Sequence, residues 1–289
     1  MNSRIASNDL EFVICEIKAR LLKGKIIRKY KDSSDDDLRI IADYLSHNAI
    51  SAFPYEFTND YRIEDFPVIK DPDCGLFFLE RGGRRIYLRT GYKSAFRASR
   101  YIKNLFMEQD IRSPHCYTEG GFLPEEGSIL LDVGGAEGIF TFEHIDKVKH
   151  AYIFECDQRW IDALKQTFKD QMDKITIVEK YVTGFTDNEH ITIDDFVKLN
   201  GLENEKIFIK ADIEGDEINL IDGASHLINS NANLKFAICS YHFQEHEQII
   251  TERFSGWNII PTKGYMLYYY DFGFTDPYVR KGVLRISRG

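Results

Sequence analysis

The chain has 289 residues, of which 43% are hydrophobic, so it is long enough for one large domain with an extension. Its net charge of −9 argues against a general nucleic-acid binder, because such proteins usually carry a basic balance. The five cysteines show no CxxC spacing, and no segment is apolar enough for a signal peptide or a membrane span, which predicts a cytoplasmic protein with reduced thiols and no zinc site.

The first 120 residues predict an extension that differs in character from the rest of the chain. A β-hairpin is expected around Gly82 and Gly83. This mixture of short elements is too small for an independent enzyme. We expect residues 1–120 either to cap the larger domain, residues 121–289, or to form the interface of a homodimer. The helical patterns in the extension are Asp9–Leu22, Asp35–His47 and Lys93–Glu108.

Eight cations give this extension a basic run in an otherwise acidic protein. Lys93 and Arg97 are four residues apart and share a helix face, which suits a ligand with a phosphate or a carboxylate. A solvated helix face is the alternative. A cluster of aromatic residues between Tyr265 and Tyr278 predicts core packing, with stacking on a sugar ring as the other interpretation. The cations are Arg81, Arg84, Arg85, Arg89, Lys93, Arg97, Arg100 and Lys103.

The most informative stretch follows the extension. An apolar run ends at Asp132, three glycines and a helical pattern follow, and a second apolar run ends at Glu155. This order predicts a strand, a glycine turn, a helix and a second strand, a unit that binds a nucleotide-like ligand over the carboxyl ends of parallel strands. The Glu155 carboxylate suits the two hydroxyls of a ribose, and Asp157 either supports it or caps the next helix.

Asp132 and Glu137 indicate which ligand binds. In a dinucleotide-binding loop the pyrophosphate rests on the helix N-terminus, and these two carboxylates would repel it. S-adenosylmethionine has no phosphate but carries an ammonium and a sulfonium, so acids near the loop favour it. A capped turn in another kind of α/β protein is the alternative. The expected cofactor-binding residues are Asp132, Gly134, Gly135, Gly138, Glu155 and Asp157.

Strand and helix patterns alternate from Ile129 to the end of the chain. They predict a Rossmann-like α/β fold, with a mostly parallel seven-stranded sheet and helices on both faces. The third strand is expected to end near an adenine site within Val182–Asp187. The expected strands are Ile129–Val133, Ala151–Glu155, Ile175–Val182, Lys206–Asp212, Leu234–Tyr241, Trp257–Pro261 and Gly282–Arg288, and the expected helices include Gly138–Asp146, Asp216–Asn229 and Glu245–Phe254.

Charged residues at the end of the fourth strand are candidates for catalysis. Lys210, Asp212 and Glu214 alternate along the strand and share one side. Asp212 could take a hydroxyl proton or orient a substrate, and Lys210 could keep Asp212 ionised or bind an anionic group. Glu214 and Asp216 could instead do no more than charge the first turn of the following helix.

Two further predictions concern histidine and aspartate side chains. His242 ends the fifth strand, and its near-neutral pKa suits a general base. It could also be a hydrogen-bonded structural residue, or a metal ligand together with His246, although we expect no metal. Asp194 or Asp195 is predicted to cap a helix N-terminus.

Three stretches, in their order and spacing, resemble motifs of the FkbM family of S-adenosylmethionine-dependent methyltransferases. They are Leu131–Thr141, Ile191–Phe196 and Phe208–Glu217. The resemblance implies the class I methyltransferase fold and O-methylation of a hydroxyl on a sugar, a glycan or a related small molecule, without a required metal. Ala136 and Glu137 depart from the family pattern, so a non-catalytic, methyltransferase-like binding module is the alternative. A methyltransferase for RNA or protein is a third hypothesis, and the acidic balance disfavours RNA.

Overall fold

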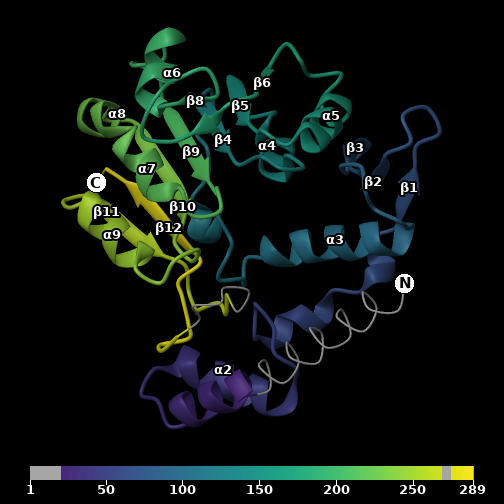
Figure 1. Cartoon of the computed structure of the whole chain (residues 1–289), viewed down its shortest axis with the longest axis vertical. Helices are drawn as coiled ribbons and strands as arrows, with labels where there is room; N and C mark the ends of the chain where they lie inside the picture. The colour runs from purple at the N-terminus through teal and green to yellow at the C-terminus, as the bar shows by residue number, and fades with distance from the viewer. Residues whose placement is uncertain (1–20, 269–274, 289) are drawn as a thin grey trace, which may run out of the picture.

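The computed structural model describes residues 21–268 and 275–288. At its centre is a seven-stranded sheet in the order β11-β12-β10-β9-β4-β5-β6, in which β12 runs antiparallel to both neighbours (Figure 1). This arrangement confirms the predicted Rossmann-like, mostly parallel sheet. The strands are β4 (Ile129–Val133), β5 (His150–Phe154), β6 (Ile175–Val178), β9 (Ile207–Ala211), β10 (Leu234–Cys239), β11 (Asn258–Pro261) and β12 (Val283–Ser287).

Helices cover both faces of the sheet. Phe140 and Leu164 belong to the core on one face, and Phe196, Leu227 and Phe254 belong to the core on the other. Every residue of β4 and β9 is buried, which is typical of parallel strands enclosed on both sides. On the first face lie α4 (Ile139–His144) and α5 (Gln158–Thr167), and on the second lie α6 (Ile193–Leu199), α7 (Glu217–Asp222), α8 (Ser225–Ser230) and α9 (His246–Arg253). Helix α3 (Ala95–Glu108) shares the first core but contacts the extension's strands Val68–Lys70 and Phe77–Arg81.

The chain changes direction across the sheet at β4. It runs outward from β4 through β5 to β6, and then returns to place β9 on the other side of β4. In open α/β sheets a ligand binds at such a switch point, outside the carboxyl ends of the strands. The ends of β4, β5 and β9 therefore mark the place for a ligand.

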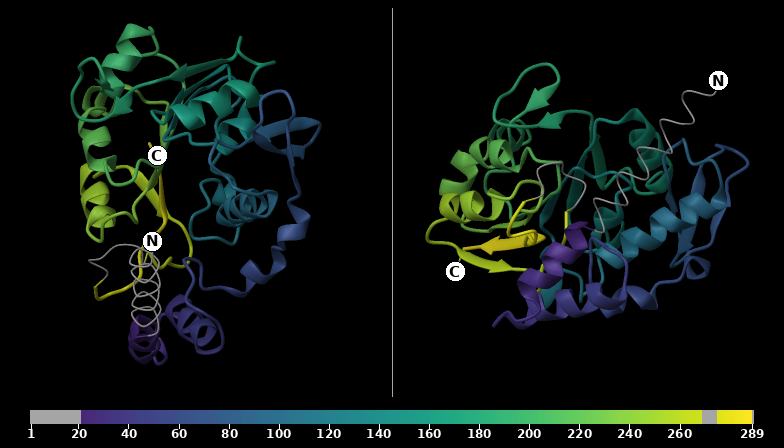
Figure 2. Two further views of the ribbon diagram at one scale, coloured as in Figure 1. Left: turned by 45° about the vertical axis from the view of Figure 1, so that its right-hand side comes forward. Right: turned by 60° about the horizontal axis from the view of Figure 1, so that its bottom comes forward.

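The extension lies beside the sheet, as the purple and blue segments of Figure 2 show. Its predicted hairpin is confirmed, and Gly82 and Gly83 turn it with positive φ angles of 58° and 76°. The predicted helix Asp9–Leu22 falls almost wholly outside the described residues, of which the first, 21–30, are helical. The other elements are α2 (Asp36–His47), β1 (Val68–Lys70), β2 (Phe77–Arg81), β3 (Arg84–Tyr87) and the 3-10 helices Glu56–Asp60, Ile63–Asp65 and Glu119–Gly121.

The first helices of the extension pack against the end of the chain. Ile41 and Leu45 of α2 share a small core with Leu267 and Val279. Of the predicted aromatic cluster, residues 269–274 lie outside the described ranges. None of the helices within those ranges is long and apolar enough to cross a membrane.

The structure corrects two predicted element boundaries. The third strand ends at Val178, because the chain turns at the polar pair Glu179 and Lys180, and β7 (Tyr181–Val182) pairs instead with β8 (His190–Ile191) in a separate sheet. The single helix expected over Asp216–Asn229 is divided into α7 and α8 at Gly223.

The predicted caps also differ in detail. Thr192 caps α6, since its hydroxyl accepts from the Asp195 amide, so neither aspartate caps that helix. The Asp194 carboxylate accepts from the amides of His226 and Leu227, each at 2.8 Å. The Asp194 side chain therefore caps the N-terminus of α8, which explains why the predicted long helix is interrupted.

Candidate functional site

The glycine loop after β4 allows two backbone segments to meet closely. Gly134 has a φ of +74°, and a Cβ atom there would lie 1.9 Å from the carbonyl oxygen of Asp212. A Cβ on Gly135 would lie 2.2 Å from Ile153, and one on Gly138, with a φ of +75°, would lie 2.7 Å from Leu164. These positions therefore require glycine to bring β4, β9 and α5 together.

A cavity of about 690 Å³ lies at the ends of these strands, within the range of roughly 300–1,000 Å³ for small-molecule sites. Of the predicted cofactor residues, Gly134, Glu155 and Asp157 line it. Gly135 and Gly138 belong to the loop but do not line the cavity. Val182, Thr183 and Phe185, from the predicted adenine region, also line the cavity.

Glu155 connects the loop to the second strand. Its carboxylate accepts three backbone hydrogen bonds of 2.8 Å each, from the amides of Ala136, Cys156 and Asp157. A carboxylate offers about four acceptor positions, so one remains for a ligand hydroxyl. Asp157 caps α5, since it accepts from the Arg159 amide at 2.9 Å, and it also lines the cavity.

Two carboxylates near the loop face away from this cavity. Asp132 is fully buried, and its carboxylate contacts the Lys210 ammonium at 3.1 Å and accepts from the Thr141 hydroxyl at 2.8 Å. Glu137 is buried as well and accepts from the hydroxyl of Tyr101 on α3 at 2.6 Å. Burial raises the pKa of Glu137 to about 7. Neither residue lines the cavity, so the structure does not support the repulsion of a pyrophosphate that we predicted from them.

Lys210 binds the backbone of the glycine loop. Its ammonium donates to the carbonyl oxygen of Gly134 at 2.6 Å and lies beside Asp132. Burial lowers the pKa of Lys210, but the Asp132 and Asp212 carboxylates more than compensate, and the net shift is upward. Lys210 therefore remains a cation and cannot act as a base near neutral pH.

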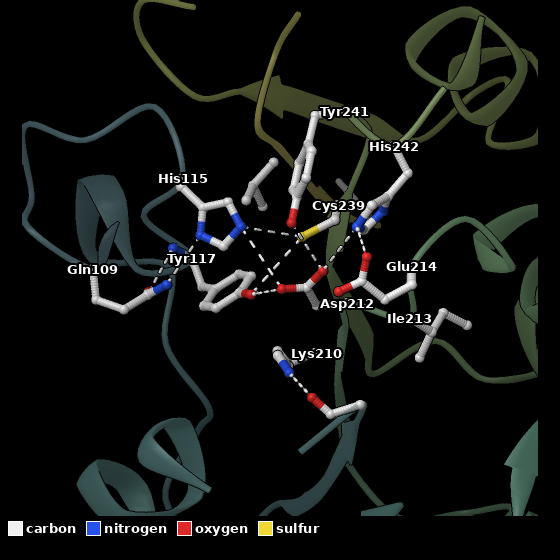
Figure 3. A network of polar contacts seen from close by, with 12 residues as sticks. Gln109, His115, Tyr117, Lys210, Asp212, Ile213, Glu214, Cys239, Tyr241 and His242 are labelled. Carbon is white, nitrogen blue, oxygen red and sulfur yellow. Dashed lines mark hydrogen bonds and ion pairs between the residues drawn. The ribbon is translucent and has the colours of Figure 1, made fainter. Parts of the chain in front are cut away.

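Asp212, at the end of β9, is the centre of a polar network (Figure 3). Its carboxylate accepts from the hydroxyls of Tyr117 at 2.9 Å and Tyr241 at 3.2 Å. The Nε2 atoms of His115 and His242 lie 3.7 and 3.5 Å from its oxygens, on opposite sides. Burial opposes ionisation, yet the facing histidines, Lys210 and the Tyr117 hydroxyl give Asp212 a lowered pKa.

His242 lies between carboxylates. Its Nδ1 is 2.8 Å from Glu217, which is fully buried, and its Nε2 is 3.6 Å from Glu214. Burial lowers the pKa of His242, but the hydrogen bond to Glu217 and the charges of Asp212 and Glu214 give a net rise. Burial raises the pKa of Glu217, but His242 and His246 reverse this and lower it to about 2. Glu217 is therefore a permanent anion that orients His242.

A second cavity, of about 380 Å³, lies on the other side of Asp212. His115 and Tyr241 line it, and both contact the Asp212 carboxylate, which lines the first cavity. Burial lowers the pKa of His115 to about 4, so this ring is neutral at pH 7. Asp212 is thus positioned where a ligand in one cavity would meet a ligand in the other.

Within the described ranges, two groups of side chains could hold a metal ion. One group is His115, Asp212 and Cys239, and the other is Asp212, Glu217 and His242. Donors that mix nitrogen and oxygen, with a sulfur in the first group, would suit a divalent transition metal. The second group is equally consistent with hydrogen-bonded histidine–carboxylate pairs, and the expectation of no metal stays a prediction.

The structure thus brings Lys210, Asp212 and His242 together, as their places in the sequence predicted, and adds partners that the prediction missed. Tyr241 could have been suggested by its place before His242, and Glu217 by its place in the third motif. His115 and Tyr117 lie in the loop just before β4, and from that position alone the sequence predicts only that they could close over the cofactor. Their contact with Asp212 depends on how the loop before β4 folds back, for which the sequence gives no signal.

Comparison with solved structures gives distant matches. The FkbM methyltransferase from Methylobacillus flagellatus KT is 18% identical, with a TM-score of 0.44 over 68% of this chain and 56% of that one. Precorrin-6y C5,15-methyltransferase from Geobacter metallireducens GS-15 is 9% identical, with a TM-score of 0.39 over 70% and 94%. SMU.1697c from Streptococcus mutans, solved in complex with SAH, is 9% identical, with a TM-score of 0.38 over 60% and 93%.

These likenesses do not assign an activity to the chain. This chain spans little more than half the length of the FkbM methyltransferase. No protein-family model and no curated protein matches the sequence. Membership of the FkbM family therefore remains a prediction.

Proposed function

We propose that the chain is an S-adenosylmethionine-dependent O-methyltransferase. The observation that carries the proposal is the cavity at the switch point of the sheet, bounded by the glycine loop and by the Glu155 carboxylate. In this proposal Gly134 and Glu155 hold the nucleoside part of the cofactor, and Glu155 accepts a ribose hydroxyl at its free position. Asp132, Gly135 and Gly138 do not line the cavity, and in this proposal they fix the conformation of the loop.

The charge of the cavity favours a cationic ligand. Five carboxylates line it and Lys180 contributes a cation, so a pyrophosphate would meet mainly negative charge. The ammonium and sulfonium of S-adenosylmethionine would meet favourable charge. This argument replaces the one based on Asp132 and Glu137. The lining carboxylates are Glu155, Asp157, Asp212, Glu214 and Asp216.

S-adenosylmethionine supplies a methyl group on a sulfonium, which becomes a neutral thioether when the methyl leaves. Asp212 accepts a hydrogen bond from the hydroxyl of the acceptor and holds its oxygen toward the methyl, since positioning supplies much of the rate of such a displacement. As the new O–CH₃ bond forms, the hydroxyl proton passes to Asp212 and from there to solvent. Tyr117, Lys210 and His242 keep Asp212 oriented and ionised.

We propose a sugar, a glycan or a related small molecule as the acceptor. The resemblance to the FkbM motifs supports this class, and the modest volume of the second cavity favours a small molecule. The rival function, a non-catalytic binding module, predicts binding of neither S-adenosylmethionine nor S-adenosylhomocysteine.

Calorimetric titration with S-adenosylmethionine, S-adenosylhomocysteine and NAD tests the cofactor. We expect micromolar binding of the first two and none of NAD. Glu155→Gln should weaken binding about 10–100-fold, because its amide nitrogen would face backbone N–H groups that now donate to Glu155. The exposed Glu64→Gln is the control and should bind as the wild type does. If the wild type binds neither sulfur compound, the binding module becomes the better proposal.

Removal of metal tests the role of the Asp212 network. After dialysis against EDTA, we expect an unchanged rate of methyl transfer, because Glu217 engages one nitrogen of His242 and Asp212 faces the other. The rate is measured as S-adenosylhomocysteine released, with and without added Mg²⁺ or Mn²⁺. A rate that disappears with EDTA and returns with metal would show that this group holds an ion instead.

A further inference from the structure

The second cavity is built largely by the extension. Residues 50–53 and 58, one face of α3 and His115 line most of it, and Tyr241, Met266 and Tyr268 complete it. The cap that we expected the extension to form would therefore enclose this cavity together with residues of the larger domain. The segment before β4 supplies walls of a cavity whose inner end contacts Asp212.

One face of α3 turns toward this cavity. Its lining residues follow the i, i+3, i+4, i+7, i+8 spacing of a single helix stripe. The outer end of the stripe carries two cations, and the inner end carries a methionine and a glutamate. The five residues are Arg100, Lys103, Asn104, Met107 and Glu108.

The two cations have no counter-charge within the described residues. Neither Arg100 nor Lys103 forms an ion pair or a hydrogen bond there. Burial and the neighbouring Arg100 both lower the pKa of Lys103, so the two positive charges repel each other across one helical turn. An anionic group bound between them would remove this repulsion.

The carboxylate in the same stripe does not neutralise them at neutral pH. Burial, together with the charges of Asp212, Glu137 and Glu214, raises the pKa of Glu108 to about 8. Glu108 is therefore largely protonated at pH 7, and it can donate a hydrogen bond to an oxygen in the cavity. The cavity is thus cationic at its outer end and neutral in the middle.

The inner end joins the reaction centre. Phe53, Tyr241 and Tyr268 supply aromatic surface, on which the face of a sugar ring can pack. Tyr241 donates to Asp212, and His115 lies 3.7 Å from it. A molecule in the cavity could therefore place a hydroxyl near Asp212 while a charged substituent remains at the cations.

From this arrangement we infer that the second cavity binds the methyl acceptor, and that the acceptor is a small hydroxyl compound carrying a phosphate or a carboxylate, which Arg100 and Lys103 hold. The identification of the bound molecule as a methyl acceptor rests on the proposed function. The anion site itself stands on the cavity and its unpaired cations. It differs from the earlier prediction for Lys93 and Arg97, neither of which lines the cavity.

The test is calorimetric titration of the full chain with glucose, glucose 6-phosphate and glucuronate at low ionic strength. We expect one or both charged probes to bind about tenfold or more tightly than glucose, because charge-assisted contacts are stronger than neutral ones. Whichever charged probe binds better identifies phosphate or carboxylate as the preferred group. The double variant R100Q/K103Q should lose this advantage, with its thermal transition unchanged.

A second double variant, K169Q/K198Q, removes the same net charge from exposed positions outside both cavities. It should keep the preference of the wild type. Equal binding of charged and neutral probes, no binding of any probe, or a preference that survives in R100Q/K103Q would overturn the inference. Titration of each variant with S-adenosylmethionine separates the two proposals. If the wild type does not bind S-adenosylmethionine, the proposed function is refuted. The anion site is then judged by the three sugar probes alone.

Discussion

Asp212→Asn is expected to lower turnover by about 10²–10⁴-fold and to leave the affinity for S-adenosylmethionine nearly unchanged. The amide cannot take the hydroxyl proton. Its NH₂ group would also meet the hydroxyl of Tyr117 or Tyr241, both of which now donate to the carboxylate. Since the amide oxygen can still accept a hydrogen bond from the acceptor hydroxyl, kcat should fall with little change in KM. Release of S-adenosylhomocysteine, with the most active member of a panel of sugars, sugar phosphates and sugar acids, measures the rate.

Asp216→Asn is the matched control for this variant. Asp216 lines the same cavity but accepts from Asn219 and does not contact the network around Asp212. We expect it to retain turnover within about twofold. Full activity in Asp212→Asn, or an equal loss in both variants, would remove Asp212 from the reaction.

The pattern of the sequence predicted the fold well where local signals are strong. The apolar run Ile129–Val133 and the glycines after it agree with β4 and its loop to the residue. Boundaries were wrong where a tertiary contact decides them. Asp194 begins α8 from a distant part of the chain and so interrupts a helical pattern that is continuous in the sequence. A periodicity within one window cannot report such a contact.

The candidate site was predicted only in part, because the sequence pattern places some of its residues and tertiary contacts place the others. Residues that end parallel strands meet by topology alone, which is why Lys210, Asp212 and His242 could be expected together. The loop carrying His115 and Tyr117 is not the end of a strand, and no hydrophobic periodicity in the sequence predicts its position. Likewise, the second cavity needs residues 50–53 and 58 to lie near His115 and Tyr241, and no motif in that stretch predicts this.

The buried pair of Lys210 and Asp132 should matter most for stability. Both side chains are at least 93% buried, and among the described residues the Asp132 carboxylate has one other hydrogen-bond partner, Thr141. Lys210→Met leaves that carboxylate without its counter-charge, and also leaves the Gly134 carbonyl without a donor. We expect the free energy of unfolding, measured by urea denaturation, to fall by about 3–5 kcal/mol.

The exposed pair Lys165–Glu179 provides the comparison, since both side chains are 49% exposed. Lys165→Met should cost less than about 1 kcal/mol, because water screens the remaining charge. The double variant Lys210→Met/Asp132→Asn should lose less than the two single variants together, since no buried charge is then left unpaired. If Lys210→Met is no more costly than Lys165→Met, the pair does not support the loop. Lys210 would then have to be explained by the charge it presents to Asp212.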